Sequence, residues 1–328
     1  MILVCGGAGY IGSHMVHELV RRGEPTAVID NLQNGHRPAV HPRAVFFQGD
    51  IRDRAVLDEI FSRHEIEAVV HFAANSLVGE SVEQPLKYFN NNVHGLQILL
   101  EAMVAHGVDK IVFSSTAATY GEPARIPIFE GDAANPTNPY GESKLIMEKM
   151  MKWVGWAHGV KYVSLRYFNV AGAVEDGSLG EDHRPETHLI PLILQVPLGQ
   201  RDHISVFGDD YDTPDGTCIR DYIQVMDLVE AHWRALGYLR EGGVSEIFNL
   251  GSAQGFSVKE MISAAEKVVG QPIKTVVEAR RAGDPARLVA SSEKAAKILS
   301  WRPRYAGVEE IIGTAWKWHQ SHPRGFEE

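Results

Sequence analysis

The sequence predicts an α/β protein with a Rossmann-type doubly wound parallel sheet and a smaller C-terminal α/β part. Three observations indicate this fold. The chain opens with a short apolar run that leads into the glycine-rich stretch Gly6–Gly12. Apolar runs then alternate with helical patterns, as in a parallel sheet with helices on both faces. The alternation stops after about Asn169, where a segment rich in Gly, Pro, Asp and His begins.

The expected strands of the sheet are short apolar runs. They are Ile2–Cys5, Thr26–Asp30, Ala44–Gln48, Ala68–Phe72, Lys110–Ser114 and Lys161–Tyr167. The helical patterns between them predict a first helix that ends near Arg22, and others over Val56–His64, Pro85–His106 and Tyr140–Trp156. Pro139 precedes the last of these, at a favoured first-turn position.

The second half is expected to contain fewer long elements. Residues 171–220 have the composition of a segment that builds a binding site rather than a core. Further patterns predict strands at Arg220–Gln224 and Glu246–Leu250, and helices at Asp227–Leu239, Val258–Val269 and Val308–His319. We therefore expect one domain over residues 1–170 and a second over 171–328, with segments within about 219–250 returning to the first.

Composition excludes several classes of function. The 328 residues suit two domains, and no apolar run approaches the roughly 20 residues of a membrane span. A formal charge of −10 argues against a nucleic-acid surface. The two cysteines, Cys5 and Cys218, form neither a disulfide framework nor a Cys/His cluster at zinc spacing, so no metal site is predicted. No signal peptide precedes the glycine-rich stretch, and a cytoplasmic location is the default expectation.

The glycine-rich stretch has the spacing of a phosphate-binding loop. Gly6, Gly9 and Gly12 stand three apart, and Gly7 offers the alternative spacing Gly-x-Gly-x-x-Gly. Such glycines permit a tight turn, a close approach of the pyrophosphate and close packing of the helix on the strand. The following helix then directs its first N–H groups at the phosphates. Because a strand precedes the motif and a helix follows it, we expect a dinucleotide site.

Two carboxylates stand where an adenosine is expected. Asp30 ends the second strand and is placed to accept both ribose hydroxyls. It would repel a 2′-phosphate, which favours NAD over NADP. Asp50 and Ile51 follow the third strand and are placed to meet the adenine, although Asp50 could also serve only as a turn residue after Gly49.

Tyr140 and Lys144 are four residues apart, so they share one face of the predicted helix. We expect the charge of Lys144 to lower the pKa of Tyr140, so that the phenol can act as a base. The run Ser114–Thr116 follows the fifth strand, at the carboxyl edge where ligands bind in such sheets. A base beside a hydride-accepting cofactor is the equipment for oxidising an alcohol.

These motifs resemble those of the extended short-chain dehydrogenases/reductases and, within them, of the UDP-glucose 4-epimerases. The resemblance runs along the whole chain. It rests on the runs Gly6–His14, Asp30–Leu32, His71–Ala74, Val78–Ser81, Asn90–Val93, Tyr167–Asn169, Gly208–Tyr211, Asp215–Thr217, Arg220–Ile223 and Arg280–Asp284.

The resemblance implies an NAD-binding first domain and a second domain for a sugar nucleotide. The implied NAD contacts are Gly6, Gly9, Tyr10, Ile11, Gly12, Asp30, Asn31, Asn34, Gly35, Asp50, Ile51, Phe72, Ala73, Ala74, Ser76, Asn91, Ser114, Tyr140, Lys144 and Phe168. The implied substrate contacts are Thr116, Tyr140, Asn169, His188, Leu189, Ser205, Val206, Phe207, Arg220, Arg281 and Asp284.

The resemblance also implies a reaction. Tyr140, assisted by Thr116, removes the proton of the 4′-hydroxyl, and tightly bound NAD takes hydride from C4′. Hydride then returns to the other face of the 4-keto sugar, which interconverts UDP-galactose and UDP-glucose. A homodimer is implied as well, with the helices Pro85–His106 and Tyr140–Trp156 forming a four-helix bundle across a two-fold axis.

The chain departs from many relatives at two positions, Ser76 in place of Lys and His188 in place of Asn, and from some relatives at Leu288, where they have a bulky Tyr. The smaller Leu288 leaves N-acetylated hexoses as an alternative substrate, beside UDP-glucuronate and UDP-xylose. A 4,6-dehydratase is disfavoured because Ala117 and Ala118, rather than an acidic pair, follow Thr116. A dinucleotide-sensing protein without catalysis is the alternative from another class.

Overall fold

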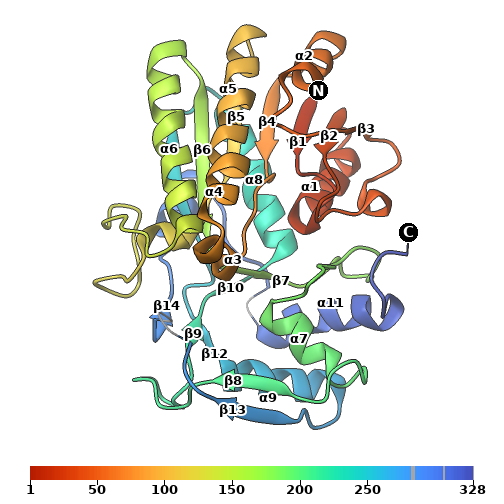
Figure 1. The fold of residues 1–328 in the computed structure, drawn as a ribbon, viewed down its shortest axis with the longest axis vertical. Coiled ribbons are helices and arrows are strands. Elements are labelled where there is room, and N and C mark those ends of the chain that lie inside the picture. The colour runs from red at the N-terminus through yellow and green to blue at the C-terminus, as the bar shows by residue number, and fades with distance from the viewer. Residues whose placement is uncertain (282–284, 306, 328) are drawn as a thin grey trace.

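A computed structural model describes residues 1–281, 285–305 and 307–327 (Figure 1). Its upper part is built on a seven-stranded sheet in the order β11-β6-β5-β4-β1-β2-β3, with every neighbouring pair parallel. The strands are β1 (Ile2–Cys5), β2 (Thr26–Asp30), β3 (Val45–Gln48), β4 (Ala68–His71), β5 (Lys110–Ser114), β6 (Lys161–Tyr167) and β11 (Glu246–Leu250). The predicted fold class is confirmed.

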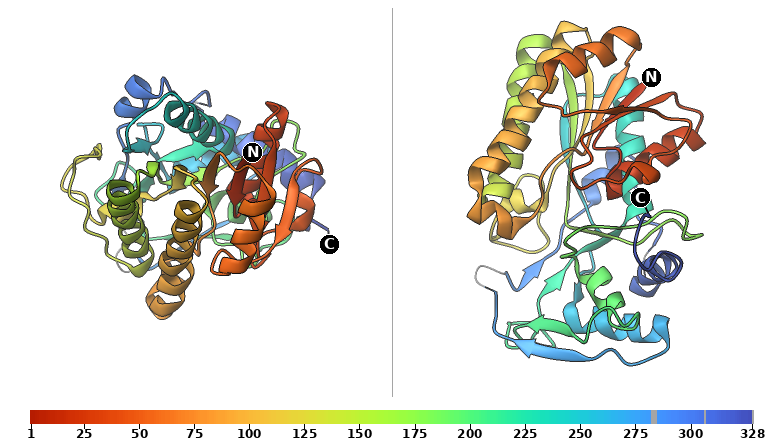
Figure 2. Two further views of the ribbon diagram at one scale, coloured as in Figure 1. Left: turned by 90° about the horizontal axis from the view of Figure 1, so that it is seen from above. Right: turned by 45° about the vertical axis from the view of Figure 1, so that its right-hand side comes forward.

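Helices cover both faces of this sheet, as the right-hand view of Figure 2 shows. One face carries α1 (Tyr10–Arg21) and α8 (Val225–Arg240), and the other carries α2 (Arg54–Arg63), α5 (Gly95–Ala105) and α6 (Pro139–His158). Successive residues of β1 alternate between the two cores, and all four are fully buried. This double burial explains why the strands read as continuous apolar runs.

The helix expected over Pro85–His106 is not a single α-helix. Short helices α3 (Val78–Glu83) and α4 (Pro85–Tyr88) lead into the π turn Phe89–His94, labelled η2, before α5 begins. The amide of the fully buried Asn92 donates to the Asn75 carbonyl and the Ser143 hydroxyl, both at 3.0 Å. These bonds tie the wider turn to the start of α6, a long-range contact that helical periodicity does not reveal.

The lower part has its own core between helices and a two-stranded sheet. Its helices are α7 (Leu189–Gln195), α9 (Val258–Val269) and α11 (Val308–Ser321), whereas α10 (Glu293–Ile298) packs against the upper core beside β11. Its strands are β7 (Asn169–Ala171), β8 (Ile204–Phe207), β9 (Ile219–Arg220), β10 (Tyr222–Gln224), β12 (Phe256–Ser257), β13 (Thr275–Glu278) and β14 (Arg287–Leu288). Two 3-10 turns, η1 (Arg37–Ala39) and η3 (Ala117–Tyr120), lie in the upper part.

The prediction of a single strand over Arg220–Gln224 is wrong, because the structure has two strands there, β9 and β10. β9 pairs with β12 and β14, whereas β10 pairs with β7, and Asp221 separates them. The buried Asp221 carboxylate accepts hydrogen bonds from the Ser252 and Ala290 amides at 2.7 and 3.2 Å. Asp221 therefore holds together three segments that are distant in the sequence.

The chain crosses between the two parts more than once. β11 pairs with β6, so a segment beyond residue 219 contributes an edge strand to the first sheet. The domain boundary near residue 170 stays a prediction. Among the described residues, no helix combines the length and apolar character that crossing a bilayer needs.

Candidate active site

The glycine loop between β1 and α1 has a shape that suits a pyrophosphate. A Cβ on Gly12 would lie 2.0 Å from the Gly6 carbonyl oxygen, so this glycine is what lets α1 pack onto the loop. A Cβ on Gly9 would meet only that same oxygen, at 3.5 Å, so the space beyond Gly9 is open. Gly9 is the N-cap of α1 and has no side chain to cap it. The first N–H groups of α1 are therefore available to phosphate oxygens.

Asp30 connects this loop to the turn that follows β2. One carboxylate oxygen accepts from the Ala8 amide at 2.9 Å and the other accepts from the Leu32 amide at 2.8 Å. Each oxygen has a further lone pair for a ribose hydroxyl. The loop after β2 also packs against the glycine loop, since a Cβ on Gly35 would lie 2.8 Å from the Ala8 carbonyl carbon.

The structure brings the second predicted carboxylate to the same edge of the sheet. The Asn31 amide donates to Asp50 at 3.0 Å. Arg52 also binds Asp50, and its hydrogen bond lowers the pKa of that carboxyl to about 2. Ile51 is buried in the core beside α5. The contact of Asp50 and Ile51 with an adenine stays a prediction.

The remaining predicted NAD contacts follow β4, β5 and β6 or lie in the π turn. A Cβ on Gly6 would lie 2.6 Å from the Ala73 amide nitrogen, so the segment Phe72–Ala74 packs on the glycine loop. Asn91 donates to Asn92, Ser76 is exposed and Phe168 is half-buried. The Ser114 hydroxyl forms a hydrogen bond with the Tyr167 hydroxyl.

Tyr140 and Lys144 stand on the first turns of α6. Asn138 caps this helix by accepting from the Gly141 amide at 2.9 Å. Lys144 is 2% exposed, and its Nζ donates to the Ser114 carbonyl at 2.8 Å. Burial lowers the pKa of Lys144 to about 7, although the carboxylate of Glu148 opposes the shift.

The predicted lowering of the Tyr140 pKa by the charge of Lys144 stays a prediction. Burial raises the pKa of Tyr140, and a hydrogen bond with Thr116 lowers it. The Lys144 ammonium is directed at the Ser114 carbonyl. Tyr140 and Thr116 are nevertheless brought together as the sequence predicts.

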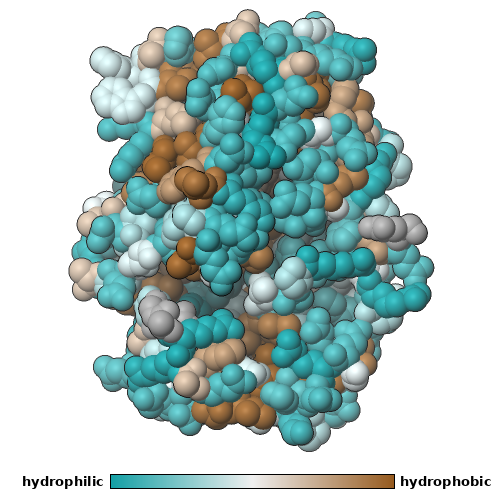
Figure 3. Space-filling view, in the orientation of Figure 1, coloured by the Kyte–Doolittle hydropathy of each residue, from teal (hydrophilic) through white to brown (hydrophobic). Residues whose placement is uncertain are grey.

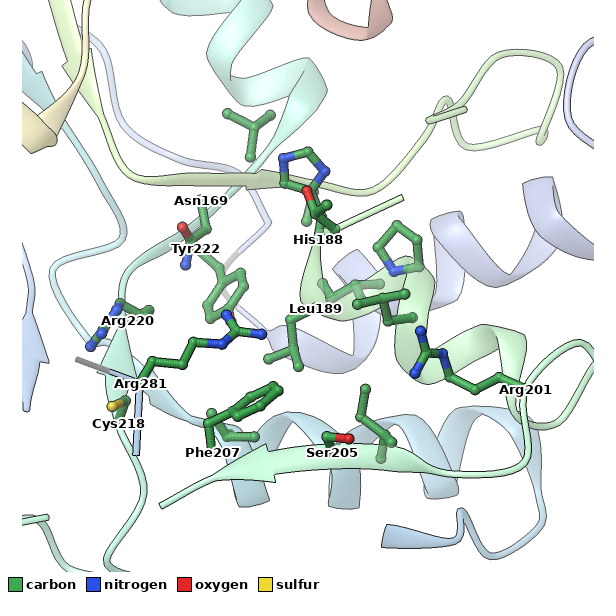
Figure 4. Close-up of a pocket in the computed structure, with 18 residues that line it drawn as sticks. Asn169, His188, Leu189, Arg201, Ser205, Phe207, Cys218, Arg220, Tyr222 and Arg281 are labelled. Atoms are coloured by element: carbon green, nitrogen blue, oxygen red, sulfur yellow. The ribbon is translucent and has the colours of Figure 1, made fainter. Parts of the chain in front are cut away.

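A cavity of about 330 Å³ opens in the lower part of the chain, and all of its lining residues lie from Asn169 onward. Figure 4 shows Phe207 and Ser205 on one wall, with Asn169 and Tyr222 on the opposite wall. The Arg281 guanidinium lies 3.8 Å above the Phe207 ring. The predicted substrate residues in its lining are Asn169, His188, Leu189, Ser205, Phe207, Arg220 and Arg281.

Comparison with known proteins places this geometry in a family. Residues 2–251 match the model of the NAD dependent epimerase/dehydratase family. The UDP-glucose 4-epimerase of Lacticaseibacillus casei is 59% identical over 325 residues, which are 99% of this chain and 98% of that protein. The chain belongs to the UDP-glucose 4-epimerases of this family. It is therefore an NAD-dependent isomerase, as the sequence predicts.

Solved structures agree with this assignment. A crystal structure of a UDP-glucose 4-epimerase superposes with a TM-score of 0.98 at 58% identity, covering 100% of this chain and 99% of that one. The enzyme of Bifidobacterium longum, solved with NAD+ and UDP, gives a TM-score of 0.94 at 39% identity and covers 99% of both chains.

Some predicted substrate residues lie outside the cavity lining. Val206 is 3% exposed and turned into the lower core, because side chains alternate along β8. A contact from Val206 to a uracil is therefore limited to its backbone. Thr116 and Tyr140 do not line the cavity either, and Asp284 lies outside the described residues. Arg201, Cys218 and Tyr222 also line the cavity and were not predicted as contacts, although Tyr222 lies in the run Arg220–Ile223.

A buried ion pair supports the catalytic segment. Arg166 and Glu148 are each 4% exposed, and Arg166 Nε donates to Glu148 at 2.9 Å. The Ser115 hydroxyl donates to the same carboxylate at 2.6 Å. The pair thereby fixes the residue before Thr116 relative to α6. Sequence motifs missed it because Glu148 lies on α6, Arg166 on β6 and their partner Ser115 after β5.

Proposed function

We propose that the chain interconverts UDP-galactose and UDP-glucose through a transient ketone at C4′ of the hexose. The pairing of Tyr140 with Thr116 at the carboxyl edge of the sheet carries this proposal, and the cavity in the lower part supplies room for a nucleotide. When bound, NAD accepts hydride from C4′ and returns it to the opposite face of the keto sugar. Relatives named UDP-glucose 4-epimerase support the choice of substrate.

The chain supplies proton transfer and orientation. Tyr140 takes the proton of the 4′-hydroxyl and later gives it back, while the Thr116 hydroxyl holds the phenol oxygen. The ammonium of Lys144 provides positive charge within a buried site, where electrostatic interactions are stronger than in water. Because burial raises the pKa of Tyr140, its phenolate is a stronger base toward the 4′-hydroxyl proton, and the phenol holds that proton firmly once it has taken it.

The cavity is suited to holding the nucleotide more firmly than the hexose. The Phe207 ring offers a flat face for the uracil, and Arg281 already stacks on that ring. Guanidinium groups of Arg220 and Arg281 bind a diphosphate by paired hydrogen bonds. Such a grip leaves the keto sugar free to turn between the two hydride transfers.

The test is a coupled assay that converts UDP-galactose without added NAD and reads UDP-glucose through a dehydrogenase. Wild type is expected to turn over, and Tyr140→Phe is expected to lose about 10²- to 10⁴-fold in kcat. Tyr238→Phe, on the remote helix α8, is the matched control and should retain full activity. No turnover by wild type, even with NAD added, would contradict the proposal. UDP-glucuronate, UDP-xylose and simple NAD binding would then be tested in turn.

A second substrate class is favoured by Leu288. This side chain packs beside Ala117 and Tyr120, close to the residues that follow Thr116. A leucine there leaves more room than a tyrosine for an N-acetyl group. A related structure from Campylobacter jejuni, 43% identical with a TM-score of 0.85, is described as a UDP-Glc/GlcNAc 4-epimerase. Turnover of UDP-N-acetylgalactosamine that falls in Leu288→Tyr would support this, and no turnover by wild type would remove it.

We also propose that the chain forms a homodimer in which α5 and α6 pair across a two-fold axis. We propose the cytoplasm as its location. Trp153 and Trp156 on α6 are 61% and 81% exposed, and Leu86 on α4 is 80% exposed. Figure 3 shows apolar patches over the region of these helices. The two free cysteines suit a reducing compartment. Light scattering should give twice the monomer mass, with dissociation in Trp156→Lys. A monomer mass for wild type would contradict the dimer.

A further inference from the structure

Four side chains from the segment between β7 and α7 converge on one point. They are Glu181, His183, Glu186 and His188. One ligand atom from each lies within 4.8 Å of all the others. The spacing Glu-x-His-x-x-Glu-x-His brings them together within eight residues. Cys/His spacing gives no hint of this cluster, because two of its members are glutamates.

The distances within the cluster are those between ligands of a small cation. Nδ1 of His188 lies 3.0 Å from Glu181 and 2.9 Å from Glu186. Nδ1 of His183 lies 3.2 Å from Glu181 and 3.6 Å from Glu186. A tetrahedral Zn²⁺ with ligands at about 2.0–2.1 Å separates neighbouring ligand atoms by about 3.3–3.4 Å. The four observed distances lie on both sides of that value.

A second observation points to a ligand at this place. Glu181 is 3% exposed, and its Oε1 makes no hydrogen bond with the described residues, despite two imidazole nitrogens within 3.2 Å. Nδ1 of His183 is likewise buried without a hydrogen bond. These two atoms face each other at 3.2 Å as an ion pair without hydrogen-bond geometry, and buried polar atoms that lack good hydrogen bonds cost free energy. A cation at the centre would satisfy both atoms at once.

The charge of the cluster agrees with a cation. The carboxylates of Glu181 and Glu186 lie within 3.6 Å of the imidazole nitrogens of both His183 and His188. Two carboxylates held this close together attract positive charge. A divalent ion would neutralise both carboxylates at once.

We propose that Glu181, His183, Glu186 and His188 bind one divalent transition-metal ion, of which Zn²⁺ fits best. Imidazole nitrogen and carboxylate oxygen are both ordinary zinc ligands. Four protein ligands leave no open position, which is typical of a structural rather than a catalytic zinc. The ion therefore organises the chain and takes no part in the transfer of hydride or proton.

The position of the cluster shows what the ion would organise. His188 is both a ligand and part of the cavity wall. The His183 ring packs edge-on against Tyr10 of the phosphate loop, with ring centres 6.1 Å apart. The Glu181 carbonyl accepts from the indole of Trp318 on α11 at 3.0 Å. One ion would therefore tie the cofactor loop, the substrate wall and the last helix together.

The test uses the tag-free full chain, dialysed against a chelator and then titrated with ZnCl₂, CoCl₂ or MgCl₂. One Zn²⁺ per chain is expected, with the intense visible absorption of tetrahedral Co²⁺ and a higher Tm in zinc. Mg²⁺, which prefers oxygen ligands in octahedral geometry, should neither bind nor stabilise. A site that takes no Zn²⁺, or an octahedral Co²⁺ spectrum, would overturn the proposal.

Matched variants locate the ion. His183→Gln and Glu186→Gln should each weaken zinc binding by about 100-fold or more and lose the zinc-dependent rise in Tm. His158→Gln, at the exposed end of α6, is the control and should bind zinc as wild type does. Circular dichroism confirms that each variant is folded. If a cluster variant does not fold, the Co²⁺ spectrum of wild type decides between a tetrahedral site, which supports the proposal, and an octahedral one, which overturns it. Equal zinc binding by a folded cluster variant and wild type would contradict the assignment.

Discussion

The catalytic site and the substrate cavity hold their charged groups in different ways. Lys144, Glu148 and Arg166 are at most 4% exposed, and each is fixed by hydrogen bonds across elements. Arg281 in the cavity is exposed and rests on an aromatic ring. The difference teaches that the buried charges of the catalytic site fix the geometry of the reacting groups. The exposed cation of the cavity instead sets the affinity for the substrate. Substitutions on the two sides should therefore change different kinetic quantities.

The largest effect is expected for Lys144→Met. Loss of the buried ammonium should lower kcat by about 10²- to 10⁴-fold. The free energy of unfolding should not fall, because burial of this ammonium is unfavourable, as its pKa of about 7 indicates. Steady-state kinetics and urea unfolding measure the two quantities. Lys149→Met, exposed on the same helix, is the control. A large loss of stability without loss of kcat would reverse the assignment of Lys144 to catalysis.

Glu148→Gln should instead destabilise the fold. The substitution leaves the guanidinium of Arg166 buried without its counter-charge, at a cost of about 3–5 kcal/mol. Urea unfolding measures this loss. The double variant Glu148→Gln/Arg166→Met should recover part of it, since the buried unpaired charge is then absent. Additive losses in the double variant would show that the two residues do not act as a pair.

Arg281→Ala should change affinity alone. Loss of charge-assisted hydrogen bonds to a diphosphate costs about 1.5–3 kcal/mol, or roughly a 10- to 100-fold rise in KM. The kcat should stay within about threefold, because the reacting carbon lies at the other end of the substrate. Arg302→Ala, exposed outside the cavity lining, controls for the loss of one surface cation. A fall in kcat with unchanged KM would remove the contrast between the two regions.

The smallest effect concerns His71, which is fully buried within reach of the Lys144 charge. Burial and the nearby Lys144 charge lower the pKa of His71 to about 3, and neither ring nitrogen has a hydrogen bond among the described residues. The unfolded chain binds a proton near pH 6.5 and the folded chain does not, so stability falls as pH falls from about 6.5 toward 3. At pH 5.5 the loss is about 1.4 kcal/mol. His71→Leu should unfold with a correspondingly weaker pH dependence in urea, and an equal dependence would contradict this origin.

The elements that follow from local pattern were predictable and the contacts between distant segments were not. The strands of the sheet and the helix of Tyr140 were expected because apolar runs and capping residues are visible in sequence. The π turn before α5 and the break at Asp221 depend on hydrogen bonds to residues far along the chain. The pairing of Glu148 with Arg166 is hidden for the same reason.

By itself, the sequence determined the sheet, the phosphate loop and the identity of the groups on α6, since each depends on spacing within one element. Only the tertiary structure decided that Lys144 is almost fully buried and that Val206 turns away from the cavity. It alone brings His183 beside Tyr10 of the phosphate loop. The physical reason is that burial and distance are set by which elements pack together, and a one-dimensional pattern contains neither quantity.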